Sequence, residues 1–220
     1  MIIDFKAHIM PGMDKTCKSR IDTIRRLMAA KDAGVDLIVA APVYDPDEST
    51  VDEFLERREK SEDILASLMN EELPDVLPAA MVIYRDSLLT AEGLEKLCFG
   101  DKCFLLSMKD AEWNDTTEAV LRRLTGALGM KVILANAGEA VLKHGEKMQQ
   151  LGVHVLLDLD EIHHKKQIRA FLPFIANGLI SALGSDWESE RPYRFLRKAI
   201  RRMDAAFDTV MCASAKLLGK

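Results

Sequence analysis

Short apolar segments rich in β-branched residues alternate along this chain with longer segments in which apolar residues recur at helical spacing. This alternation is typical of parallel βα units. Seven of the short segments predict strands, at residues 2–5, 37–41, 76–83, 103–107, 131–135, 153–157 and 179–183. Helices are predicted at 20–33, 51–70, 116–128, 138–151, 165–177, 193–203 and 207–218.

Residues with a preference for helix ends support this division. Gly34 and Gly129 follow predicted helices, and glycine tolerates the left-handed backbone that often closes a helix. Asp115 or Thr116 can cap the helix that begins there. Seven parallel βα units can close into a barrel or form an open, doubly wound sheet, and functional residues lie at the carboxyl ends of the strands in both.

Length and composition favour one globular domain over residues 1–220, because 48% hydrophobic residues in a chain of this length can bury one substantial core. Acidic and basic residues are interleaved and the net charge is −5, so we expect no nucleic-acid partner. The apolar runs are shorter than the roughly 18–20 residues that cross a bilayer. We therefore expect no direct membrane insertion, and any membrane association through a protein partner. The four cysteines form no CxxC pair, which favours a cytoplasmic location.

The stretch from Asp4 to Asp14 contains the most specific motif, a strand that runs into a histidine, a Pro-Gly turn and an aspartate. It resembles the Asp-x-His-x-His-x-x-Pro-Gly-x-Asp signature of the PHP (polymerase and histidinol phosphatase) superfamily, with Lys6 at the first histidine and His8 at the second. Within this superfamily it is similar especially to the bacterial tyrosine phosphatases of capsule and exopolysaccharide operons. It implies an α/β fold, a distorted seven-stranded parallel (β/α)7 barrel related to the TIM barrel, with metals at the carboxyl ends of its strands.

Most of the family's metal-ligand positions are substituted in this chain, whereas His8 and Asp186 match the pattern. The substituted positions are Lys6, Val43, Met81, Ser107 or alternatively Met108, Asn136 and Glu188. Valine and methionine supply no hard donor, and a lysine ammonium repels a divalent cation. We therefore expect no bound cofactor. An active protein would need a divalent metal such as manganese, iron or zinc.

The candidate pocket at the strand ends consists of Lys6, His8, Asp14, Asn136, Asp186, Glu188 and Arg191. Any metal there would use His8 and Asp186, with Glu188 as a further candidate. Alternatively, His8 is a strand-end histidine hydrogen-bonded to Asp186 or to a backbone carbonyl. Lys6 can pair with Asp14, Asp186 or Glu188 and replace a metal by an internal cation.

A second acidic and histidine-rich cluster, which holds Asp160, His163 and His164, follows the sixth predicted strand. His163 lies about one helical turn from Asp160, so the cluster can form a relocated metal site. The alternative is a helix start with acidic residues at its N-terminus and solvated histidines.

Three functions remain open. The first is a noncatalytic relative of the metal-dependent tyrosine phosphatases, with a protein partner in polysaccharide or tyrosine-kinase signalling. The second is an active phosphatase with a rebuilt metal site. The third is a metal-free enzyme or small-anion binder that uses Lys6 and Arg191. The last two predicted helices can seal the barrel or form a contact between subunits, so a homo-oligomer is possible.

Overall fold

The structure, a computed structural model, describes residues 1–159, 162, 165–185, 193 and 195–220. These residues form nine strands: β1 (Ile3–Ala7), β2 (Leu37–Ala40), β3 (Val43–Tyr44), β4 (Asp75–Pro78), β5 (Met81–Ile83), β6 (Cys103–Ser107), β7 (Lys131–Ala135), β8 (His154–Asp158) and β9 (Ile180–Gly184). They also form seven α-helices: α1 (Arg20–Ala33), α2 (Val51–Ala66), α3 (Asp115–Arg122), α4 (Gly138–Gln150), α5 (Lys165–Ala176), α6 (Leu196–Met203) and α7 (Ala205–Leu217). Short 3-10 turns occupy Asp86–Leu89 and Leu94–Leu97, and a π-helical turn, Arg123–Ala127, continues α3.

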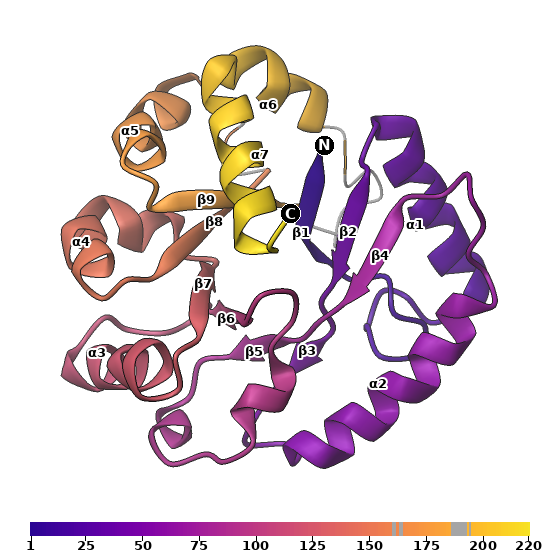
Figure 1. Cartoon of the computed structure of the whole chain (residues 1–220), viewed down its shortest axis with the longest axis horizontal. Helices are drawn as coiled ribbons and strands as arrows, with labels where there is room; N and C mark the ends of the chain where they lie inside the picture. Colours follow the sequence, from indigo (N-terminus) through magenta and orange to yellow (C-terminus); the bar gives the residue numbers. More distant parts are fainter. Residues whose placement is uncertain (160–161, 163–164, 186–192, 194) are drawn as a thin grey trace.

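The strands are parallel and belong to two hydrogen-bonded sheets, in the orders β1-β2-β4 and β3-β5-β6-β7-β8-β9. Figure 1 shows them arranged around a common centre, with α1 to α5 on the outside. An α/β fold with parallel strands is therefore confirmed. The two sheets do not form one continuous ladder in the described residues.

Two interruptions separate the sheets, one within the predicted strand 76–83 and one just after the predicted strand 37–41. The strand expected at 76–83 is two strands, β4 and β5, and β3 follows β2 after Pro42. Proline has no N–H to donate and therefore interrupts a ladder. Hydrogen bonds span the break, because the Ala79 N–H donates to the Ala40 carbonyl at 2.8 Å and the Met81 N–H donates to the Pro42 carbonyl at 2.9 Å. The broken segments therefore keep a parallel course.

Every second residue of the strands points into the interior, as expected for strands that pack helices on one face and a hydrophobic core on the other. This interior cluster includes Phe5, Val39, Leu105, Ile133 and Leu156. Leu217 and Leu218, at the end of α7, pack in the same cluster, and Figure 1 shows the C-terminus over the centre of the strands. The end of the last helix thus fills the interior.

An irregularity in β1 changes which face its later residues occupy. Asp4 pairs with Ile38 and Ala7 pairs with Ala40, so two residues of β1 lie opposite one residue of β2. This is a β-bulge, which redirects side chains. Lys6 consequently faces the interior end of the strands, where its Cβ lies 2.9 Å from the position that a Cβ on Gly184 would take.

The predicted strands 103–107 and 131–135 and the predicted helix 20–33 are confirmed to the residue. Gly34 closes α1 in the left-handed conformation (φ 80°), as expected. Several predicted helices are too long at one end: α2 ends at Ala66, α5 at Ala176, and α6 begins at Leu196. The predicted caps of α3 are wrong, because Asn114 accepts the capping bond from the Thr117 N–H at 2.9 Å.

Among the described residues, no helix is long and apolar enough to cross a membrane.

Candidate functional site at the carboxyl ends of the strands

Four polar side chains from four strand ends form one hydrogen-bonded chain, which we call the mouth network: Lys6, Asp158, Asn136 and Ser107. The Lys6 ammonium pairs with Oδ1 of Asp158, and both residues are buried, at 5% and 4% exposure. Asn136 Nδ2 donates to Asp158 Oδ2 at 3.2 Å, and Ser107 Oγ donates to Asn136 Oδ1 at 2.9 Å. The network therefore links the ends of β1, β8, β7 and β6.

The backbone at Asn136 helps to build this network. Asn136 has a φ of 54°, in the left-handed region that asparagine tolerates better than most residues. It directly follows β7, so its amide reaches both Ser107 and Asp158 on the neighbouring strands. An asparagine can donate and accept at once, which lets one side chain connect a hydroxyl to a carboxylate.

His8 and Asp14 form a second pair in the loop after β1. His8 Nδ1 lies 3.1 Å from Asp14 Oδ1, while the Met10 N–H donates to Asp14 Oδ2 at 3.0 Å. Arg26 from α1 donates to the His8 carbonyl. The contact between Nδ1 and the carboxylate fixes the orientation of the imidazole ring. The same arrangement supports histidines that bind a metal through the other ring nitrogen.

The described residues of the mouth do not fit a divalent metal. The described residues contain no group of three or more His, Cys, Asp or Glu side chains placed to hold an ion. Lys6 places a positive charge at the interior end of β1, and Asp158, the nearest carboxylate, is already engaged by it. A metal at this point would meet a buried ammonium at close range, which costs free energy in a low-dielectric site.

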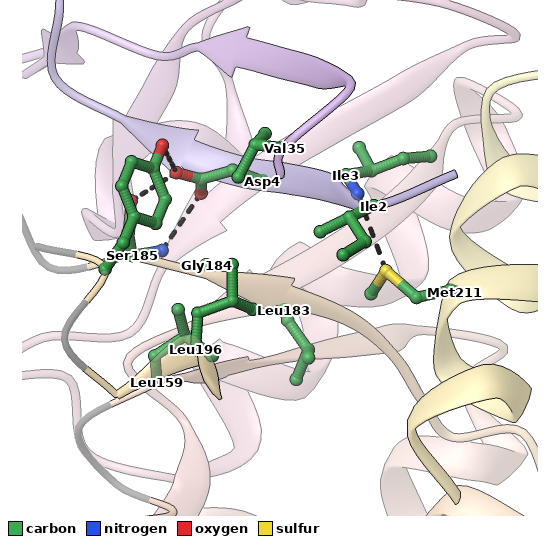
Figure 2. Close-up of a pocket in the computed structure, with 11 residues that line it drawn as sticks. Ile2, Ile3, Asp4, Val35, Leu159, Leu183, Gly184, Ser185, Leu196 and Met211 are labelled. Carbon is green, nitrogen blue, oxygen red and sulfur yellow. Dashed lines mark hydrogen bonds between the residues drawn. The ribbon is translucent and has the colours of Figure 1, made fainter. Parts of the chain in front are cut away.

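A third polar cluster joins β1 to β9, and we call it the seam. Asp4 is 4% exposed and accepts hydrogen bonds from the Ser185 N–H at 2.9 Å, from the Ser185 hydroxyl and from the Tyr193 hydroxyl at 2.8 Å. It also accepts from the Lys6 N–H at 3.1 Å. Figure 2 shows Asp4 on β1 facing Ser185 at the end of β9. One carboxylate thus connects two strands that belong to different sheets.

Burial, followed by the negative charge of Asp4, raises the pKa of the Tyr193 phenol well above its ordinary value of 10.0. The hydroxyl therefore stays protonated and remains a donor to Asp4. The cavity beside this cluster has a volume of about 10 Å³ and is otherwise lined by apolar residues such as Val35 and Leu196. That volume holds one water at most, so the seam is a structural cluster and not a substrate pocket.

The structure brings some of the predicted site residues together. Lys6 and Asn136 meet through Asp158, and His8 meets Asp14. Asp14 is one of three alternative partners predicted for Lys6, but it is occupied by His8 and by the Met10 N–H, and Lys6 pairs with Asp158. The remaining candidates lie outside the described residues: Asp160, His163, His164, Asp186, Glu188 and Arg191.

Sequence reasoning did not identify Asp4 and Tyr193 as partners, nor Asp158 as the partner of Lys6. One signal was available for Asp4, because an aspartate inside the apolar run Ile2 to Phe5 needs buried hydrogen-bond donors. No comparable signal existed for the lysine pair, since 152 positions separate its members in the chain.

Comparison with known proteins supports the fold. No protein-family model matches the chain, and no curated protein matches its sequence. A crystal structure of the metal-dependent tyrosine phosphatases YwqE from Bacillus subtilis and CpsB from Streptococcus pneumoniae matches with a TM-score of 0.75 and 18% identity, over 99% of this chain and 94% of that chain. A probable 2-pyrone-4,6-dicarboxylic acid hydrolase from Acinetobacter baumannii, solved with citric acid bound, matches with a TM-score of 0.53 and 13% identity, over 100% and 99% of the two chains. The chain therefore shares the overall fold of these structures.

Proposed function

We propose that this protein is a noncatalytic relative of the metal-dependent tyrosine phosphatases, in which an internal ion pair takes the place of a metal. The observation that carries the proposal is the buried pair between Lys6 and Asp158. Lys6 occupies the position of the first histidine in the Asp-x-His-x-His signature that the chain resembles. The bulge in β1 directs its side chain to the interior. A lysine supplies charge at this point without a cofactor.

The proposal follows from what the chemistry of a phosphatase of this kind requires. Metal-assisted hydrolysis needs bound ions that lower the pKa of water and stabilise the leaving oxygen. The mouth network has an ammonium, a carboxylate, an amide and a hydroxyl in their place, linked in a chain from Lys6 through Asp158 and Asn136 to Ser107. Such a network stabilises the strand ends but leaves no activated nucleophile.

We further propose a single domain over residues 1–220, a distorted seven-stranded βα barrel in which β2 with β3 and β4 with β5 are interrupted single strands. A cytoplasmic role in regulation or assembly, with a protein partner in polysaccharide or tyrosine-kinase signalling, is the setting that the resemblance favours. The match to the structure of YwqE and CpsB supports the fold in this proposal.

Metal content and phosphatase activity test the proposal together. Freshly purified, untagged protein is analysed for manganese, iron and zinc, and turnover of an aryl phosphate is measured with and without added manganese. We expect well under one equivalent of metal and no turnover. The variant Lys6→His, which restores the family's residue, is also expected to stay inactive, because Val43 and Met81 still offer no ligand.

The alternative of an active phosphatase with a rebuilt site makes the opposite prediction. One or more equivalents of metal, with turnover lost in Asp186→Ala, would overturn the noncatalytic proposal and establish that site. The third alternative, a metal-free enzyme or anion binder that uses Lys6 and Arg191, is less favoured, because the Lys6 charge is already balanced by Asp158.

A further inference from the structure

The segment from residue 15 to residue 31, which covers the loop before α1 and most of that helix, is basic. It holds six basic residues and one acidic residue, whereas the whole chain has a net charge of −5. Positive charge concentrated on one part of an acidic protein makes that part a place where an anionic surface can bind.

The outward face of α1 also carries three exposed apolar side chains, which we call the α1 stripe. Ile21, Ile24 and Met28 are 62%, 37% and 54% exposed. Their spacing places them within about 60° of arc, because an α-helix turns about 100° per residue. The opposite face of the helix is buried against the core, so the orientation of the stripe is fixed.

Basic side chains flank the α1 stripe. Arg20 and Arg25 lie on its two sides, and Lys15 and Lys18 lie in the loop before the helix; all four are exposed. Within the described part of the chain, none of the four forms an ion pair. Long basic side chains beside an apolar stripe can bury their stems and keep their charges at a polar surface.

We propose that the outward face of α1 adsorbs to an anionic lipid bilayer, with the α1 stripe in the headgroup region and the flanking basic residues against lipid phosphates. Figure 1 shows α1 at the periphery of the molecule, and the convex face of one helix suits a flat surface. The basic residues supply the electrostatic attraction that such binding needs. A symmetric contact between two copies is disfavoured, because it would set the two basic segments against each other.

This adsorption needs no spanning helix and does not rest on the proposed function. It differs from the sequence-based expectation that membrane association would run through a protein partner. The carrying observation is the coincidence on one helix face of an exposed apolar stripe and basic residues without ion-pair partners.

Vesicle sedimentation tests the proposal with the full-length protein at low salt. We expect binding to vesicles that contain phosphatidylglycerol, little binding to pure phosphatidylcholine, and release as salt is raised. The double variant Arg20→Gln/Arg25→Gln should weaken the binding roughly twenty-fivefold, because each basic residue near an anionic membrane contributes about fivefold. Ile21→Ser/Met28→Ser should also weaken it, at unchanged net charge.

Matched controls remove equivalent groups elsewhere. Arg57→Gln/Lys60→Gln takes two exposed positive charges from α2, and Leu142→Ser removes an exposed apolar side chain from α4. Both controls should bind vesicles like the wild type, and circular dichroism checks that every variant is folded. No binding to phosphatidylglycerol vesicles, or equal losses in controls and α1 variants, would overturn the proposal. Binding to polyglutamate without binding to vesicles would overturn it in favour of an acidic protein partner.

Discussion

At the scale of single residues, the Lys6–Asp158 pair is the interaction whose loss should cost most. Removal of one member of a buried ion pair leaves the other charge without compensation, which typically costs about 3–5 kcal/mol. We therefore expect Lys6→Met to lower the free energy of unfolding by that order, measured by urea denaturation. The double variant Lys6→Met/Asp158→Leu should recover much of the loss, because it removes both charges.

The matched control for this pair is Lys60→Met, which removes a lysine from an exposed pair with Glu56 on α2. Exposed pairs contribute little, so this variant should unfold like the wild type. If Lys6→Met were as stable as Lys60→Met, the ion pair would not hold the mouth network together.

Tyr193 gives a prediction with a defined pH dependence. Its pKa is raised well above 10.0 in the folded protein, first by burial and then by Asp4. The unfolded chain therefore loses this proton first as the pH rises, and the stabilising contribution of the protonated phenol declines above about pH 10, toward the folded pKa. Wild-type stability should fall more steeply there than that of Tyr193→Phe, by up to about 1.4 kcal/mol per pH unit.

Denaturant unfolding at a series of pH values checks this, with Tyr193→Phe as the comparison that removes only the hydroxyl. Below pH 9 the variant should be less stable by about 1.5–3 kcal/mol, because it loses a hydrogen bond to a charged group. Parallel stability curves above pH 10 would contradict the raised pKa.

At the scale of elements, the sequence predicted most strands and helices because their hydrophobic periods are clear. It could not predict the bulge in β1, because the alternation of apolar and polar residues does not show where one strand has an extra residue opposite its neighbour. The bulge directs Lys6 to the interior, where its ammonium pairs with Asp158. The broken strand at 76–83 was missed because Ala79 and Ala80 are apolar and continue the run.

The close approach of β9 to β1 gives a prediction about packing between elements. A Cβ added to Gly184 would lie 2.9 Å from Leu156 Cδ2 and 2.9 Å from Lys6 Cβ, so Gly184→Ala forces these groups apart. Overpacking of this kind typically costs about 1–3 kcal/mol. Thermal unfolding should show that loss for Gly184→Ala. Gly126→Ala, at a site where a Cβ meets nothing within 4 Å, should leave stability unchanged or slightly raised.

At the scale of the whole molecule, the seam determines how the two sheets are joined. In the described residues, β1 and β9 lie side by side but belong to different ladders. The Ile3 N–H donates to the sulfur of Met211 at 3.5 Å, a weak acceptor, and the Ser185 N–H donates to Asp4. Side-chain acceptors thus replace the backbone bonds that would otherwise close the strands into one sheet.

Asp4→Asn tests this closure. An asparagine keeps the size of the side chain, but its NH2 group would face the donors of Ser185, Tyr193 or Lys6. We expect a loss of roughly 3 kcal/mol, together with faster hydrogen exchange concentrated in β1 and β9. Strands β6 and β7, which lie away from β1 in Figure 1, should exchange at the rate set by global unfolding. Asp101→Asn, which alters an exposed carboxylate paired with Lys131, should leave all four strands unchanged. Equal acceleration of hydrogen exchange in β1, β6, β7 and β9 would show that Asp4 stabilises the whole fold and does not specifically hold β1 against β9.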